Sequence, residues 1–158
     1  MRHQPGEDIC ALRFLLSVLL MICIAYPLYA QTQTSPMTST KNVQLQIGLF
    51  RIFAEVANDE NSRARGLMYR QNLPRHHGML FVYGRAQPIC MWMKNTLLPL
   101  SVAFLNTQGR IINIAAMQPH TTNAHCSAQP ARYALEMGEG WFVEKNIGIN
   151  AQVLGLPK

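Results

Sequence analysis

Alternating apolar and polar residues dominate the chain from residue 42 onward. An alternation with a period of two residues is typical of a β-strand that buries one face, and a short apolar run is typical of a strand buried on both faces. On this basis strands are predicted over residues 43–47, 50–57, 79–83, 90–93, 100–105, 110–116, 131–137 and 151–156. Many short strands of this kind favour a mostly antiparallel sheet that curls into a barrel or a sandwich.

Two short helices and a hairpin turn interrupt these strands. Asn58 is expected to cap a helix over 59–68, with acidic residues at the positive end of the helix dipole. A second helix is expected within 138–146, and Asn146 is expected to end it in the left-handed conformation. Gly109 can take the positive φ that a hairpin turn requires. The predicted fold class is therefore α+β and mostly β: a compact antiparallel barrel-like or sandwich-like sheet with two short helices.

The N-terminal part differs in composition from this domain. Residues 14–28 form an apolar run after a segment with two arginines, and the sequence LYA offers a cleavage point after Ala30, as in a secretory signal peptide. We therefore expect 1–30 to be a signal peptide, 31–41 a flexible polar linker, and 42–158 a single globular domain. The expected location is periplasmic or secreted. The apolar run is short for a membrane span of about 20 residues, and an uncleaved membrane anchor is the alternative.

The chain is basic, with a formal net charge of +6. Residues 1–30 carry two basic and two acidic residues, so their removal leaves this charge unchanged. A positive excess favours acidic partners, such as a small anionic ligand or an anionic component of the envelope. Nucleic acid is not an expected partner, because the protein is expected to be exported and its basic residues are scattered rather than clustered. We expect a monomer.

The cysteines point to a disulfide bond. Cys10 and Cys23 leave with the predicted signal peptide, and an exported protein with two remaining cysteines, Cys90 and Cys126, is expected to join them. A cysteine nucleophile with a histidine base is the less favoured interpretation, since a thiolate has to stay reduced.

Copper binding is a further alternative. Soft ligands for Cu(I) are present at Cys90, Met91, Met93, His120, His125 and Cys126. However, Met91 and Met93 alternate with Trp92 on a predicted strand, and this pattern favours packing in the core. We therefore expect no metal and no other cofactor.

Common catalytic signatures are absent from the sequence. It contains no G-x-S-x-G elbow, no H-E-x-x-H motif and no P-loop. The acidic residues after residue 30 do not form the close pair on strands that glycoside hydrolysis uses. No catalytic residue is assigned.

Polar residues at the end of the strand 90–93 are the first candidates for a site. Lys94, Asn95 and Thr96 bring one cation and several hydrogen-bonding groups to a strand end, where binding sites are commonly built. The alternative is a capping turn with an extended lysine. Arg63 is expected on a solvated helix face, whereas Arg65 can reach into the fold.

Two further charged residues lie on the predicted strand 131–137. Glu136 is one of the few carboxylates on a predicted strand and is the natural partner for Lys94. If Arg132 joins them, two cations face one carboxylate, and the surplus positive charge attracts an anion. The candidate ligand-binding residues are therefore Lys94, Asn95, Thr96, Arg65, Arg132 and Glu136.

Several motifs in order resemble an uncharacterised bacterial and archaeal family called domain of unknown function 192. They are R-x-x-G-L-M, G-M-L-F, W-M-K-N-T and P-A-R-Y-x-L-E, and the similarity extends from about Val43 to Val153. The resemblance implies a compact β-rich single domain with small helices that is often exported, and it implies no activity. This chain has Asn146 and Asn150 where the family customarily has glycine.

Two classes of function follow from the sequence. The first is a non-catalytic binding or envelope-associated module with a polar, cationic pocket. The second is a small envelope-acting enzyme, a hydrolase or transferase, in which Lys94 and Glu136 transfer protons. A buried Lys94 or Glu136 with a strongly shifted pKa favours the enzyme, and exposed side chains that titrate normally favour binding.

Overall fold

The structure is a computed structural model that describes residues 41–158, so the predicted signal peptide and all but the last residue of the predicted linker lie outside the described residues. Its strands are β1 (Asn42–Ile47), β2 (Phe50–Ala57), β3 (His77–Gln87), β4 (Cys90–Met91), β5 (Leu100–Leu105), β6 (Ile111–Met117), β7 (His125–Cys126), β8 (Ala131–Gly138) and β9 (Val153–Leu154). Its helices are α2 (Glu60–Arg65) and α3 (Trp141–Glu144). The predicted class, mostly β with two short helices, is confirmed.

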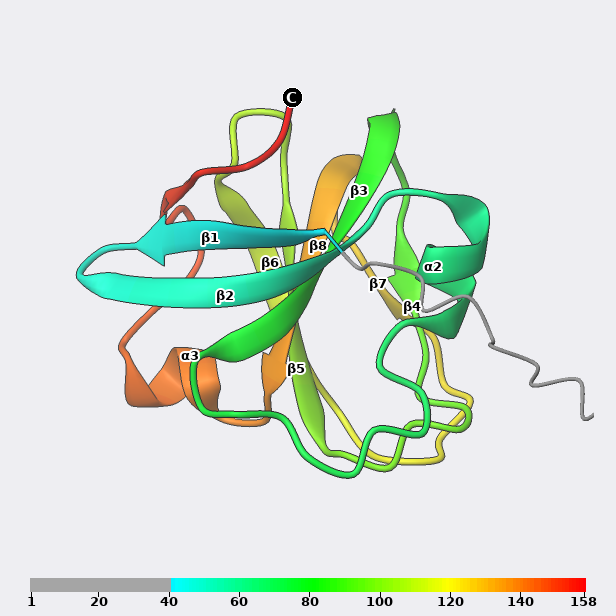
Figure 1. The fold of residues 1–158 in the computed structure, drawn as a ribbon. Helices are drawn as coiled ribbons and strands as arrows, with labels where there is room; N and C mark the ends of the chain where they lie inside the picture. The colour runs from blue at the N-terminus through cyan, green and yellow to red at the C-terminus, as the bar shows by residue number, and fades with distance from the viewer. Residues whose placement is uncertain (1–40) are drawn as a thin grey trace, which may run out of the picture. The chain divides into compact units, whose positions relative to one another are not determined.

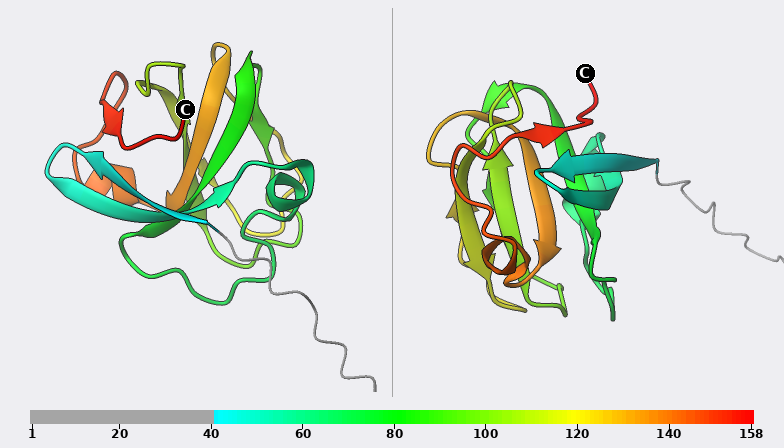
Figure 2. Two further views of the ribbon diagram at one scale, coloured as in Figure 1. Left: turned by 45° about the horizontal axis from the view of Figure 1, so that its top comes forward. Right: turned by 90° about the vertical axis from the view of Figure 1, so that its left-hand side faces the viewer.

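One curled seven-stranded sheet forms the body of the domain. Its strand order is β6-β5-β8-β3-β2-β1-β9, and β1 and β2 run across the direction of β5 and β6 (Figures 1 and 2). All pairs are antiparallel except β2 and β3, which are parallel. A parallel pair needs a crossover connection, and the segment with α2 supplies it.

Helix α2 begins one residue later than predicted. Its cap is Asp59 rather than Asn58: the Asp59 carboxylate accepts a hydrogen bond from the Ser62 backbone N–H at 2.9 Å, and the Ser62 hydroxyl accepts one from the Asp59 N–H at 3.2 Å. This reciprocal capping box satisfies two otherwise unpaired donors. If Asn58 were the cap, the residue three positions later would be Asn61 instead of Ser62, and the same capping box would not form.

A glycine ends α2 against the sheet. Gly66 has φ of 50°, and its N–H donates to the Ser62 carbonyl at 3.0 Å. A Cβ atom at this position would lie 3.3 Å from the ring of Phe81 on β3. Glycine therefore permits both the backbone conformation and the close approach. The left-handed conformations predicted at Gly109 and Asn146 are confirmed, with φ of 77° and 52°.

A small second sheet consists of β4 and β7. The strand predicted over 90–93 covers only Cys90–Met91, and β7 lies between the predicted strands 110–116 and 131–137, where no strand was expected. Cys90 and Cys126 face each other in this pair, with their Cα atoms 4.0 Å apart, and form the predicted disulfide.

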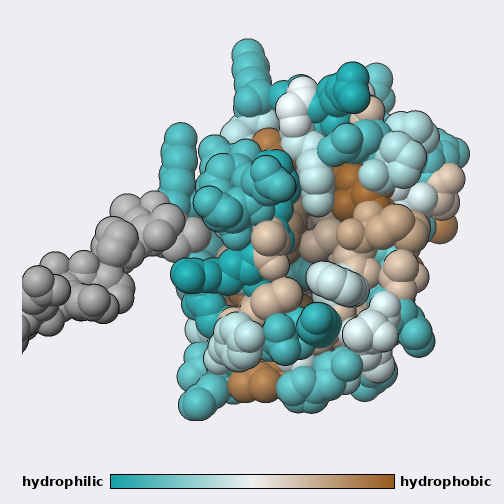
Figure 3. Space-filling model, turned by 90° about the vertical axis from the view of Figure 1, so that its right-hand side faces the viewer, coloured by the Kyte–Doolittle hydropathy of each residue, from teal (hydrophilic) through white to brown (hydrophobic). Residues whose placement is uncertain are grey.

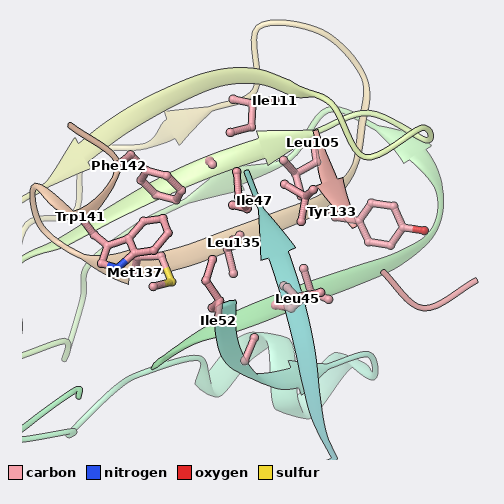
Figure 4. Packing of buried hydrophobic residues seen from close by; sticks show 14 residues of the cluster. Leu45, Ile47, Ile52, Leu105, Ile111, Tyr133, Leu135, Met137, Trp141 and Phe142 are labelled. Carbon is pink, nitrogen blue, oxygen red and sulfur yellow. The ribbon is translucent and has the colours of Figure 1, made fainter. Parts of the chain in front are cut away.

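The sheet carries a hydrophobic cluster on each face. The first, shown in Figure 4, contains Leu45, Ile47, Ile52, Leu135, Met137, Trp141 and Phe142 among others. The second contains Leu67, Met79, Phe81, Met91, Met93, Val102, Phe104 and Ala134 among others. Because side chains alternate along a strand, Glu136 on β8 points to the same side as Ala134, toward the second cluster.

Candidate functional site

Glu136 lies in the middle of the sheet. It is paired with Met79 on β3 and with Val102 on β5, and both neighbours belong to the hydrophobic core. Its exposed fraction is 4%. Within residues 41–158 its carboxylate forms no ion pair and no side-chain hydrogen bond. Burial raises the pKa of Glu136 to about 8, so the carboxyl group is mostly protonated at neutral pH.

A glycine on β3 sets the packing beside Glu136. Gly78 pairs with Met137, and a Cβ atom at this position would collide with the Glu136 carbonyl oxygen and the Met137 sulfur. Only glycine allows β3 and β8 to approach this closely. The glycine of the G-M-L-F motif therefore fixes the backbone that carries Glu136.

Glu136 lines a cavity of about 90 Å³ beneath α2. The walls come from the end of α2 and the residues after it, from β3, and from the segment that begins with β4. The lining residues are Arg63, Ala64, Arg65, Gly66, Leu67, Met68, Phe81, Tyr83, Cys90, Met91, Trp92, Thr96 and Glu136. Figure 3 views the side of the domain that carries α2 and β4, where apolar residues gather between hydrophilic ones.

A second buried polar group faces the same cavity. Thr96 is 4% exposed, and its hydroxyl forms no hydrogen bond within the described part of the chain. Its backbone N–H donates to the Met93 carbonyl at 3.0 Å, and its own carbonyl accepts from His120 at 3.2 Å. The main chain of Thr96 is thus satisfied, while the hydroxyl remains available to a ligand.

Arg63 and Tyr83 form the charged corner of the cavity. One Arg63 guanidinium nitrogen donates to the Val82 carbonyl at 3.1 Å, and the guanidinium carbon lies 5.0 Å from the centre of the Tyr83 ring. Burial raises the pKa of Tyr83, the Arg63 charge lowers it, and the Glu136 charge raises it. Tyr83 is therefore close enough to both Arg63 and Glu136 to interact with them electrostatically, while burial is the cause of the raised pKa of Glu136.

The turn after β4 directs Lys94 away from the cavity. Asn95 has φ of 63°, and its carbonyl accepts a hydrogen bond from the Tyr69 N–H at 2.9 Å. In this turn Met93 and Thr96 are buried, whereas Lys94 is exposed. The Lys94 ammonium lies 5.8 Å from the ring centre of Trp92, which is 53% exposed at the cavity wall.

The predicted site residues thus separate into two groups. Arg65, Thr96 and Glu136 line the cavity, and Lys94, Asn95 and Arg132 do not. Arg132 is partly buried, its guanidinium carbon lies 5.4 Å from the Tyr133 ring centre, and its Nε atom is buried without a hydrogen bond.

Sequence analysis did not place Arg63, Tyr83 or Trp92 in the candidate site, although all three line the cavity. Arg63 was assigned to a solvated helix face. The sequence held no clear signal for Arg63, because α2 ends at Arg65 and the nearest core residue, Leu67, lies beyond the helix.

Residues 41–158 contain no group of three or more histidine, cysteine, aspartate or glutamate residues that could hold a metal ion. For the copper alternative, Cys90 and Cys126 are joined to each other and supply no thiolate. In the same part of the chain no helix has both the length and the apolar character needed to cross a membrane.

Comparisons with known proteins give a family and two structural neighbours. The sequence profile of the family DUF192, described as "Uncharacterized ACR", matches residues 43–154. A crystal structure of a candidate transcription regulator from Sinorhizobium meliloti 1021 is similar, with 33% identity and a TM-score of 0.69, and the match covers 74% of this chain and 94% of that one. A protein of unknown function from Novosphingobium aromaticivorans DSM 12444 has 28% identity and a TM-score of 0.69, with 75% and 88% covered. Among curated proteins there is no match.

Proposed function

Since this chain belongs to the DUF192 family, whose description assigns no activity, we propose its function from the cavity itself: it is an exported domain that binds a small anionic molecule beside Glu136. The cavity supports this proposal because the expected residues Arg65, Thr96 and Glu136 line it together with Arg63, whereas Lys94 and Arg132 do not line it.

The observation that carries this proposal is the unpaired Glu136 carboxyl. Buried polar groups in proteins nearly always have a hydrogen-bond partner, and a missing partner costs free energy. Glu136 and Thr96 are both 4% exposed and line the cavity, and no protein group within residues 41–158 hydrogen-bonds to either side chain; their oxygens are not among the fully enclosed unpaired atoms, so they reach the cavity space. A ligand in the cavity would satisfy both groups.

The charges around the cavity favour an anion. Because the pKa of Glu136 is about 8, its carboxyl group contributes little negative charge at neutral pH. Arg63 and Arg65 line the same cavity and carry positive charge. The surplus positive charge thus comes from Arg63 and Arg65 on α2. Arg132 was expected to supply one of the cations at the site, and Arg63 lines the cavity in its place.

The size of the cavity restricts the ligand to a small molecule. A water molecule occupies roughly 10–15 Å³ on this measure of volume, and the cavity has about 90 Å³. A ligand with a handful of non-hydrogen atoms fits inside. Anything larger would extend out of the cavity; Trp92 is part of the cavity wall, and the Lys94 ammonium lies 5.8 Å from its ring centre.

An enzyme is the second candidate, and the raised pKa of Glu136 favours it. A carboxyl group with a pKa of about 8 can act as a general acid near neutral pH. The other expected proton-transfer group, Lys94, is exposed and does not line the cavity. Lys94 and Glu136, the two proton-transfer groups of the enzymatic hypothesis, therefore do not meet in the cavity. We accordingly favour binding over catalysis.

Export to the periplasm or beyond is part of the proposal. The Cys90–Cys126 disulfide supports it, because disulfides persist in oxidising compartments. We do not extend the description of the Sinorhizobium protein to this chain, because a role in transcription conflicts with export.

Native mass spectrometry of the protein purified from the periplasm tests this function. We expect a small anion to co-purify with the parent, to be lost on Glu136→Leu substitution, and to be retained in Glu139→Gln. Glu139 is an exposed carboxylate outside the cavity, so it serves as the matched control. Recovery of the ligand unchanged after incubation indicates binding, and its conversion indicates the enzyme. Absence of any ligand, with no small anion from a screened set binding to the purified protein, would refute the proposal.

A further inference from the structure

We infer that one end of the domain, formed by residues 48–51 and 141–152 and called here the α3 end, docks on a membrane surface that contains anionic lipids. It comprises the turn between β1 and β2, helix α3 and the loop that follows α3. Figure 1 shows α3 and this turn on one side of the domain, and α2 with β4 on the other. Membrane docking is therefore a function separate from the ligand binding proposed for the cavity.

Three large apolar side chains are exposed at the α3 end. Leu49 in the β1–β2 turn is 96% exposed, Val143 on α3 is 78% exposed and Ile149 in the following loop is 65% exposed. A single exposed apolar residue is common on protein surfaces, whereas several on one side mark a contact surface. Tight turns favour glycine and small polar residues. The turn therefore gives no structural reason for a leucine beside Gly48.

Contacts between the elements bring these side chains to the same end. The ring centre of Phe50, next to Leu49, lies 6.1 Å from that of Trp141 at the start of α3. The loop after α3 leads to β9, and β9 pairs with β1 at Ile47, immediately before the turn. The right-hand view of Figure 2 shows the turn, α3 and this loop facing the viewer together. The exposed apolar side chains thus belong to one continuous end of the domain.

Basic residues lie around these apolar side chains. Arg51 is exposed on β2, just after the turn. The Lys145 ammonium lies 5.4 Å from the ring centre of Phe50. The Arg110 guanidinium donates to the Asn150 carbonyl in the loop after α3, at 3.2 Å. None of these three cations forms an ion pair within residues 41–158.

The acidic residue of the α3 end is already paired. Glu144 forms an ion pair with Arg75 at 3.1 Å. The α3 end therefore has an excess of positive charge around an apolar centre. Apolar side chains that enter between lipid headgroups, with basic residues that contact anionic headgroups, give this combination a favourable partner. A second copy of the domain fits less well, because a symmetric contact would bring the same cations together.

Vesicle flotation of the protein recovered from the periplasm tests the inference. One set of vesicles contains phosphatidylcholine alone, and the other contains equal parts of phosphatidylcholine and phosphatidylglycerol. We expect the protein to bind the mixed vesicles, and to bind phosphatidylcholine at least about tenfold more weakly, because several cations contribute. Binding to the mixed vesicles should weaken as salt is added, since salt screens exposed charges.

Two substitutions separate the apolar contribution from the charge. Leu49→Gln keeps a side chain of similar size and should weaken binding to the mixed vesicles about tenfold. Lys145→Gln removes one cation and should weaken it about fivefold. The matched controls are Leu97→Gln and Arg85→Gln, which change exposed residues outside the α3 end and should bind as the parent does. Thermal denaturation checks that each variant is folded, and the 96% exposure of Leu49 predicts no loss there.

Several outcomes would overturn the inference. Equal binding to both kinds of vesicle, or none to the mixed vesicles, would remove the anionic membrane as the partner. Binding that survives both substitutions would assign attachment to another part of the chain, such as an uncleaved N-terminal segment. A dimer in sedimentation that dissociates in Leu49→Gln, without vesicle binding, would make the α3 end an interface between copies. The small anion sought by native mass spectrometry is a separate measurement, so either function can fail alone.

Discussion

At the scale of the residue, the buried carboxyl group of Glu136 is the centre of the candidate site. Glu136 occupies a position between β3 and β5 where the neighbouring side chains are Met79 and Val102. An apolar residue would fill such a position without a desolvation penalty. Proteins commonly depart from good core packing at functional sites and lose stability there. The position of Glu136 therefore supports a function for this residue beyond the fold.

Replacing Glu136 by glutamine should make the protein more stable at alkaline pH. The pKa of Glu136 rises from 4.5 to about 8 on folding, so the unfolded chain loses the proton first. The stability of the parent should therefore decline as pH rises from about 4.5 to 8, by roughly 3–5 kcal/mol in total. Glu136→Gln lacks this decline.

Urea denaturation at pH 5, 7 and 8.5 measures this difference. The variant should resemble the parent at pH 5 and exceed its free energy of unfolding at pH 8.5. Glu139→Gln corrects for the loss of one carboxylate elsewhere on the surface. Parallel pH profiles for the parent and Glu136→Gln would contradict the raised pKa.

Sequence patterns named Glu136 and Thr96 among the candidate residues, and both line the cavity, but the patterns could not show which other residues gather around them. Arg132 shares the predicted strand with Glu136, but four residues of strand separate them by about 13 Å. Lys94 adjoins Thr96 in sequence, and the positive φ of Asn95 places the two side chains in different environments. Backbone reversals of this kind depend on tertiary contacts, here the hydrogen bond from Tyr69 to Asn95.

At the scale of the element, α2 and the β4–β7 pair build the cavity against the sheet. The capping box begins α2 and Gly66 ends it, which places Arg63 and Leu67 over β3. The disulfide joins β4 to β7, and Cys90 lies in the cavity wall. Hydrogen bonds between Ser127 and Ile89, at 2.8 and 3.1 Å, add to this pair.

Removing the disulfide should lower stability and keep the fold. The cross-link spans 36 residues, and the chain-entropy model gives about 3–4 kcal/mol for a loop of this size. The seven-stranded sheet does not include β4 or β7, so it should persist. Denaturation of the parent with and without reductant, and of the Cys90→Ser, Cys126→Ser double variant, measures the loss. Equal stability of the oxidised and reduced parent would contradict this expectation, and the double variant should match the reduced parent.

Periodicity predicted the long elements well and the short ones poorly. Every predicted strand from 43–47 to 151–156 overlaps an observed one. Strand β7 was not predicted, because a strand of two residues carries no periodic pattern. Its pairing also depends on β4, which is distant in sequence. The strand over 90–93 ended early because the Met93 N–H donates to the Thr121 carbonyl and the chain then turns.

At the scale of the whole molecule, the domain is a curled sheet, and helix α2 and the β4–β7 pair pack against one of its faces. The expectation of a mostly antiparallel, barrel-like sheet is confirmed, with β2 and β3 as a parallel pair. That pair matters for the site, because the crossover that joins β2 to β3 contains α2 (Figure 1). A purely antiparallel meander would have needed only a tight turn there and would have left no helix to form the cavity with Glu136.

The final prediction concerns the compartment in which this domain folds. We expect the exported protein to begin at Gln31, after cleavage at the LYA sequence, and to contain oxidised Cys90 and Cys126. N-terminal sequencing and intact mass of protein from the periplasmic fraction measure both features. The same domain made in the cytoplasm without residues 1–30 should carry two free thiols, because that compartment is reducing. It should also be less stable than the exported form by the contribution of the disulfide. Recovery of an intact N-terminus in the membrane fraction would establish an anchor, and free thiols in the exported protein would contradict the assignment of compartment.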